Sequence, residues 1–291
     1  MRNLLVLISI LGAFLSASVT TARASSGEDK ALTIEVSEGN WGNANTADIE
    51  ALLYSVASEL RRFIETRPPA EIVVIPSEKA PAALYQKGRN GEYVILLSAK
   101  NRRWAQYAYQ FSHELCHVFS NYERGEVNNG VKPNQWFEEA VCEAAAVFTL
   151  RRMASTWGSN PPYSDWADYA AVLRAYAEQL TTQSHRRLPG DIAFGTWYAA
   201  NRDAVSGNPY LRQKNEVCAN LLLSLFESTP EHWAAIGYLN LHRSSAEAGF
   251  LEYLESWRQA APARHRVFIT EVIALFDLPE HRETMQTVLA R

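Results

Sequence analysis

The sequence predicts an α+β fold in two halves, a small mixed β-sheet with helices followed by an all-helical half. Short apolar runs of strand length lie before residue 100, at 31–36, 71–75 and 91–99. From Ser164 onward, apolar residues recur instead at helical spacing between turn residues. The length of 291 residues suits one large domain or two closely packed ones.

Helical periodicity in the N-terminal half predicts a first helix over residues 47–66, which Pro68 and Pro69 would end. Residues 82–90 are ambiguous between strand and loop. A loop rich in Gly, Asn and charge is expected over 123–135. The other helices expected along the chain are 102–122, 135–153, 164–183, 191–204, 211–228, 230–242, 245–259 and 265–277.

The first 24 residues have the pattern of a secretory signal peptide. Arg2 precedes an apolar run from Leu4 to Leu15, and a small-x-small cleavage site ends at Ala24. An apolar run of about 12 residues is too short to cross a bilayer, which argues against a membrane anchor. We therefore expect an exported protein, cleaved after Ala24, in a periplasm or outside the cell.

Composition argues against nucleic acid as a partner and against a fold built on disulfides. Cleavage would remove two arginines and no acidic residue, so the formal net charge would move from −4 to −6, and no basic run is present. The three cysteines are Cys116, Cys142 and Cys218. A disulfide between Cys116 and Cys142 and a set of buried thiols are both compatible with this count.

Residues 113–117 read HELCH, so His113, Glu114 and His117 stand in the order H-E-x-x-H. Residues four apart share one face of a helix, so both imidazoles could reach the same metal ion. Glu114 is offset by about 100° and is placed to act on water rather than on the metal. The alternative is two ordinary histidines on the more polar side of a helix.

A third ligand is expected on the next helix, because catalytic zinc usually takes three protein ligands. Glu139 and Glu143 are four residues apart and share a face with Trp136 and other apolar residues. Two carboxylates on an apolar face are costly to bury without a cation or hydrogen bonds. Glu138 falls on a more polar side of this helix and is the weaker candidate.

HELCH, followed after 21 residues by a glutamate in the text WFEEAVCE, resembles the gluzincin metallopeptidases. Their common form is H-E-x-x-H with W-x-x-E on a downstream helix, and the resemblance covers residues 92–150. It implies a zincin-like fold with the active-site cleft between the two halves. It further implies the following roles: zinc ligands His113, His117 and Glu139, general base Glu114, and Glu143 as the hydrogen-bond partner of a ligand histidine.

Two departures from the family pattern limit this resemblance. Ala140 stands where the family has glycine, and no G-x-M-E-N-like stretch lies upstream, so an aminopeptidase is not implied. The family keeps a sheet edge near strand 91–99, along which an extended peptide could pair; an ordinary buried strand is the alternative. For the oxyanion donor we expect Tyr210, with Arg212 second; a tyrosine packed in a loop is the alternative.

Together these features predict an exported zinc metallohydrolase that cleaves peptide or protein substrates with Zn²⁺ as cofactor. The expected organisation is a signal peptide (1–24), a zincin-like catalytic domain (25–155) and a helical domain packed on it (156–291). One alternative is a zinc hydrolase of a non-protein amide, such as a cell-wall peptide. Another is a non-catalytic zinc-binding or sensor protein that retains the peptidase fold.

Overall fold

The computed structural model describes residues 32–64, 71–125, 132–242 and 248–279. The predicted signal peptide lies outside these residues, so export stays a prediction. Pro68 and Pro69, which were predicted to end the first helix, also lie outside them. Among the helices that the structure describes, none is long and apolar enough to cross a bilayer.

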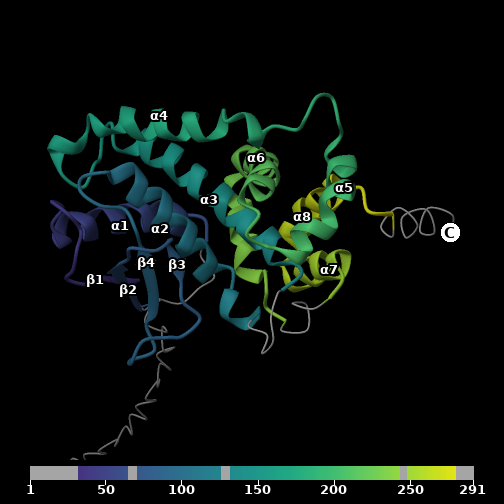
Figure 1. Cartoon of the computed structure of the whole chain (residues 1–291), viewed down its shortest axis with the longest axis horizontal. Coiled ribbons are helices and arrows are strands. Elements are labelled where there is room, and N and C mark those ends of the chain that lie inside the picture. The colour runs from purple at the N-terminus through teal and green to yellow at the C-terminus, as the bar shows by residue number, and fades with distance from the viewer. Residues whose placement is uncertain (1–31, 65–70, 126–131, 243–247, 280–291) are drawn as a thin grey trace, which may run out of the picture.

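A four-stranded mixed sheet lies in the N-terminal half, in the order β1-β2-β4-β3 (Figure 1). β2 pairs in parallel with β1 and β4, and β3 pairs antiparallel with β4. β4 is therefore an interior strand, so of the two alternatives for strand 91–99 the ordinary strand within the sheet holds and the free edge does not. The edge strands are β1 and β3, and β3 is too short to leave a pattern in the sequence. The strands are β1 (Thr33–Val36), β2 (Glu71–Pro76), β3 (Ala82–Ala83) and β4 (Tyr93–Leu97).

The helices described in the N-terminal half are α1 (Thr46–Arg61), α2 (Trp104–Phe119), the 3₁₀-helix η1 (Tyr122–Gly125) and α3 (Gln135–Thr156). The side chain of Asn45 caps α1 by accepting a hydrogen bond of 2.7 Å from the backbone N–H of Asp48. α2 contacts β3 and β4 of the sheet as well as α1 and α3. This central position makes α2 the helix about which the rest of the half is arranged.

α2 is buried on nearly all sides, and its polar residues make specific contacts with neighbouring segments. Gln110 is buried, and its Oε1 accepts hydrogen bonds of 3.0 Å from the backbone of both Ser98 and Ala99. Asn121, just past the helix end, adopts a left-handed φ of 62° and donates to the carbonyls of Gly237 and Leu239. These hydrogen bonds of Gln110 and Asn121 therefore fix α2 to its neighbours.

Every element described after α3 is helical, as predicted. The segment predicted as a helix over 230–242 is the 3₁₀-helix η4 (Pro230–Tyr238). α3 contacts α4 and α6 on one side and α2 on the other, so it joins the two halves. Because α3 runs across residue 155, the proposed domain boundary there stays a prediction. The α-helices are α4 (Tyr169–Thr181), α5 (Phe194–Gly207), α6 (Arg212–Ser228), α7 (Phe250–Ala260) and α8 (Ala263–Leu275).

Aromatic packing fixes the first turn of α3. Trp136 and Phe137 are almost completely buried. The Trp136 ring stacks on Tyr198 with centroids 5.5 Å apart, and both Trp136 and Phe137 pack against Phe250 and Phe276. Each such ring pair adds about 0.5–1.5 kcal/mol beyond its buried area. This packing holds the two residues that follow, Glu138 and Glu139, in place.

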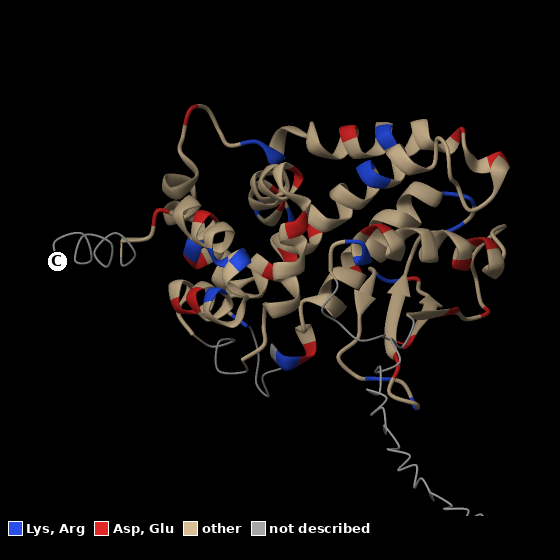
Figure 2. Cartoon of the chain, turned by 180° about the vertical axis from the view of Figure 1, so that it is seen from behind, with Lys and Arg blue, Asp and Glu red and all other residues tan. Residues whose placement is uncertain are grey.

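Seen from behind, basic and acidic residues are interspersed over both halves (Figure 2). This distribution accords with the small net charge of the chain. The expectation that nucleic acid is not a partner stays a prediction.

Candidate metal centre

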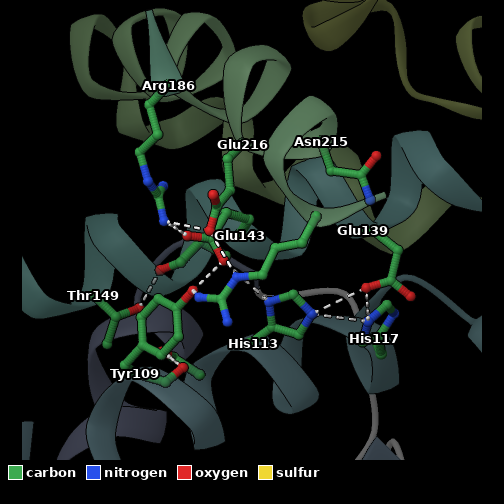
Figure 3. Close-up of polar contacts among 12 residues, drawn as sticks. Tyr109, His113, His117, Glu139, Glu143, Thr149, Arg186, Asn215 and Glu216 are labelled. Carbon is green, nitrogen blue, oxygen red and sulfur yellow. Dashed lines mark hydrogen bonds and ion pairs between the residues drawn. The ribbon is translucent and has the colours of Figure 1, made fainter. Parts of the chain in front are cut away.

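The structure brings the three predicted metal ligands together where α2 contacts α3 (Figure 3). His113 and His117 come from successive turns of α2, and Glu139 comes from α3, just after its first turn. The His113 Nε2 and His117 Nε2 atoms are 3.3 Å apart, and they lie 3.3 and 3.5 Å from Glu139 Oε2. Among the described residues, this is the group of histidine, cysteine and acidic side chains that could hold a metal ion.

His117 is oriented by Glu138, a residue that the sequence pattern ranked below Glu139 and Glu143. His117 Nδ1 lies 2.8 Å from Glu138 Oε1. Ser120 Oγ donates to the same oxygen at 2.9 Å, and Asn240 Nδ2 donates to Oε2 at 2.9 Å. A carboxylate at this position favours a proton on His117 Nδ1 and leaves Nε2 as the nitrogen that a metal ion would use.

Glu143 lies beside the Nδ1 atom of His113 but beyond hydrogen-bond distance, so the hydrogen bond that the family resemblance implied stays a prediction. Glu143 Oε2 lies 3.7 Å from His113 Nδ1 and accepts a hydrogen bond from the Tyr109 hydroxyl. Its other oxygen accepts a hydrogen bond of 2.6 Å from Arg186 Nη2. The carboxylate therefore stands on the Nδ1 side of the imidazole and leaves Nε2 facing His117 and Glu139.

The separations between the ligand atoms fit a tetrahedral ion. An ion about 2.0–2.1 Å from each ligand atom would hold those atoms about 3.3–3.4 Å apart. The three measured separations are 3.3, 3.3 and 3.5 Å. Two imidazole nitrogens and one carboxylate oxygen are a ligand set of catalytic zinc. The residues present therefore fit a zinc ion in both geometry and chemistry.

Without a cation, the same atoms compete for protons. Burial lowers the pKa of His113, but hydrogen bonds to Glu139 and Glu143 outweigh burial and raise it to about 10. Burial raises the pKa of Glu139, but His117 and His113 outweigh burial and hold it well below its usual range. The protons of the metal-free cluster therefore reside on the imidazoles rather than on the carboxylate.

Glu114 projects from the same turn of α2 but does not join the ligand cluster. Its Oε2 accepts a hydrogen bond of 2.7 Å from the backbone N–H of Ala83 on edge strand β3. Burial raises the pKa of Glu114 above its ordinary value, and His113 and His117 oppose that rise only in part. A buried carboxylate with a raised pKa is suited to accept and return a proton near neutral pH.

A buried ion-pair network that the sequence did not reveal lies behind His113. Arg186, in the 3₁₀-helix η3 (Ser184–Arg186), has a fully buried side chain between Glu143 and Glu216. Glu216 also accepts a hydrogen bond of 2.7 Å from Arg212 and lies 2.5 Å from His185 Nε2. The only sequence signal is the short basic stretch SHRR at 184–187, which resembles a solvated loop.

The predicted oxyanion donors lie on the opposite wall of the site. A pocket of about 240 Å³ is lined by His113, Glu114 and Glu139 from one side and by Tyr210 and Arg212 from the other. The Tyr210 side chain is largely exposed, and its hydroxyl accepts a hydrogen bond of 3.2 Å from Gln135 Nε2. The structure thus places Tyr210 at the pocket without a contact to the ligand cluster.

All three cysteines are buried and free, so no disulfide joins Cys116 to Cys142. Burial raises the pKa of Cys142, and its neighbour Cys116 raises it further. Burial likewise raises the pKa of Cys218. Thiols in such surroundings stay protonated at neutral pH, which suits a packing role.

The site is thus a candidate metal centre of two imidazoles and one carboxylate, with a further carboxylate beside it at the wall of a pocket. Comparison with models of known protein families gives no match, and no curated protein is significantly similar in sequence. The assignment of a chemistry therefore rests on the geometry of these residues.

Replacing Glu138 with glutamine tests whether it orients His117. The Glu138→Gln variant keeps the size of the side chain but removes the charge that holds the Nδ1 proton. We expect zinc affinity to fall about 10- to 100-fold, measured by competition with a chromophoric chelator. Glu178→Gln, on the exposed side of α4, is the matched control. Equal affinity in the two variants would remove Glu138 from the site.

The raised pKa of His113 predicts that zinc uptake releases protons. An imidazole with a pKa of about 10 is protonated at neutral pH and must lose its proton to bind metal. We expect the apparent zinc affinity to rise about tenfold per pH unit between about pH 6 and 9 for each proton displaced. Calorimetric titrations in buffers of different ionisation enthalpy would count those protons, with His113→Ala as the control. An affinity independent of pH would contradict the shift.

Proposed function

We propose that the protein is a zinc-dependent hydrolase of the gluzincin type that cleaves peptide bonds. One observation carries the proposal: three ligand atoms lie at the spacing of a tetrahedral ion, and a buried carboxylate, Glu114, opens into the same pocket. The zincin-like fold belongs to this proposal. The mixed sheet, with a short antiparallel edge strand next to the H-E-x-x-H helix, supports it.

Three residues would hold the zinc ion: His113, His117 and Glu139. When bound, the ion supplies a Lewis acid for the substrate carbonyl and lowers the pKa of water at the site. Glu138 and Glu143 keep the Nδ1 protons of the two histidines in place, so that both Nε2 lone pairs face the ion.

Glu114 acts as the general base and then as the general acid. Its carboxylate takes a proton from the attacking water and delivers that proton to the leaving amine. The hydrogen bond from Ala83 fixes the rotamer, so one carboxylate oxygen stays bound to strand β3 and the other serves the reaction. Because burial raises the pKa of Glu114, the protonated carboxyl can form near neutral pH and return its proton to the amine.

A peptide is supported as substrate by the position of β3. This strand is at the sheet edge, and Ala80 and Pro81, just before it, line the pocket beside Glu114. An extended peptide can add to such an edge through main-chain hydrogen bonds. Together with the predicted signal peptide, this supports an exported peptidase.

The Glu114→Gln variant tests the proposed base. We expect kcat for peptide cleavage to fall about 10²- to 10⁴-fold while zinc affinity changes little, because glutamine cannot take the proton and Glu114 is not a ligand. The measurement is cleavage of a peptide library by the zinc-loaded protein, read by mass spectrometry, beside the variant.

Two other outcomes of this experiment would each change the conclusion. Cleavage that survives Glu114→Gln would reject Glu114 as the base. No cleavage by either protein, with zinc still bound, would favour a non-protein amide substrate or a non-catalytic zinc-binding protein.

Tyr210 is proposed as the donor that stabilises the oxyanion formed during cleavage. Gln135 bridges Tyr210 and Glu139. Its Nε2 lies 3.2 Å from the Tyr210 hydroxyl and 3.4 Å from Glu139 Oε1. For Tyr210→Phe we expect a fall in kcat of about 10²-fold with KM nearly constant, since the hydrogen bond forms in the transition state. A rise in KM alone would instead assign Tyr210 to substrate binding.

A further inference from the structure

Arg212 is the one lysine or arginine among the residues that line the pocket. It is the first residue of α6, and its side chain is 67% exposed. The other charged residues of the lining are Glu114, Glu139, Glu143 and Glu216. The ion pair with Glu216 does not by itself explain why one accessible guanidinium lies in a pocket lined by glutamates.

The guanidinium of Arg212 is held in one orientation. Its Nε donates to Glu216 Oε1 at 2.7 Å, and its Nη2 donates to the Tyr109 hydroxyl at 3.0 Å. Among the residues that the structure describes, none accepts a hydrogen bond from Nη1. A fixed planar guanidinium with an open edge is preorganised to bind a carboxylate, because little side-chain entropy remains to be lost.

The same contacts place Arg212 away from the reacting carbonyl. Tyr109, which binds Arg212, donates in turn to Glu143, and Glu143 lies on the Nδ1 side of His113. The ligand cluster lies on the Nε2 side, so the imidazole ring separates Arg212 from an oxygen of the scissile bond. Arg212 therefore faces a part of the substrate beyond that bond.

The surroundings favour an anion at Arg212 in spite of the glutamates. Glu143 and Glu216 are already paired with the fully buried Arg186. α6 begins at Arg212 without a side-chain cap, so the positive end of its dipole lies at this residue.

We propose that Arg212 binds a carboxylate of the substrate and so makes the pocket selective for peptides with an acidic group next to the cleaved bond. The carboxylate is a free C-terminus or an Asp or Glu side chain. This inference rests on the proposed function, since it assigns a specificity to that site.

Binding measurements can test the proposal separately from catalysis. The full-length zinc-loaded protein carrying Glu114→Gln would be titrated with matched libraries of short peptides. One pair differs only in a free or amidated C-terminus, and the other pair, both amidated, differs only in Asp or Asn. We expect one pair to show about 10- to 100-fold tighter binding of the charged member, as for hydrogen bonds to a charged group. The pair that shows it identifies the carboxylate.

The Arg212→Gln substitution in the same background should abolish that preference, and Arg212→Lys should retain part of it. Arg202→Gln, an exposed arginine of α5, is the control and should leave the preference intact. Equal binding of charged and neutral peptides, or a preference that persists in Arg212→Gln with a native thermal transition, would overturn the proposal. A preference for carboxylate without cleavage by the protein with Glu114 intact would uphold this inference and reject the peptidase.

Discussion

Mutual repulsion among three electron-rich atoms is the constraint on which the rest of the site depends. Two imidazole nitrogens and a carboxylate oxygen lie within 3.5 Å of one another in a largely buried place. Such a group is stable only with a cation or protons among its members. The surrounding charges alternate outward from there: Glu138 and Glu143 behind the histidines, Arg186 behind Glu143, and Glu216 behind Arg186.

Local periodicity made the coarse fold and the ligand cluster predictable. His113 and His117 share a helical face through their spacing, and Glu139 stands in a recognisable context on the next helix. The contact between Glu138 and His117 was not foreseen because a helical wheel equates the polar side of Glu138 with solvent. α3 is buried on nearly all sides, so a polar side can equally face a histidine of α2. Burial on all sides of a helix results from tertiary packing, and a helical wheel gives no information about it.

Other features had no local signal in the sequence. Arg186 is 43 residues from Glu143, and only the packing of η3 against α6 brings its side chain to the site. Strand β3 has two residues and exists because β4 offers it a partner. Both depend on contacts between distant segments, which the alternation of apolar residues does not encode.

The residues of the site are divided between two groups of helices, which has a practical consequence for redesign. α2 and α3 carry the candidate metal ligands, Glu114, Glu138 and Glu143, whereas Arg212 of the facing wall projects from α6. The candidate metal ligands and the proposed carboxylate-binding residue therefore come from separate stretches of sequence, 104–156 and 209–216. Libraries of variants confined to the second stretch, with Tyr210 and Glu216 kept, would vary the proposed selectivity without changing the candidate ligands.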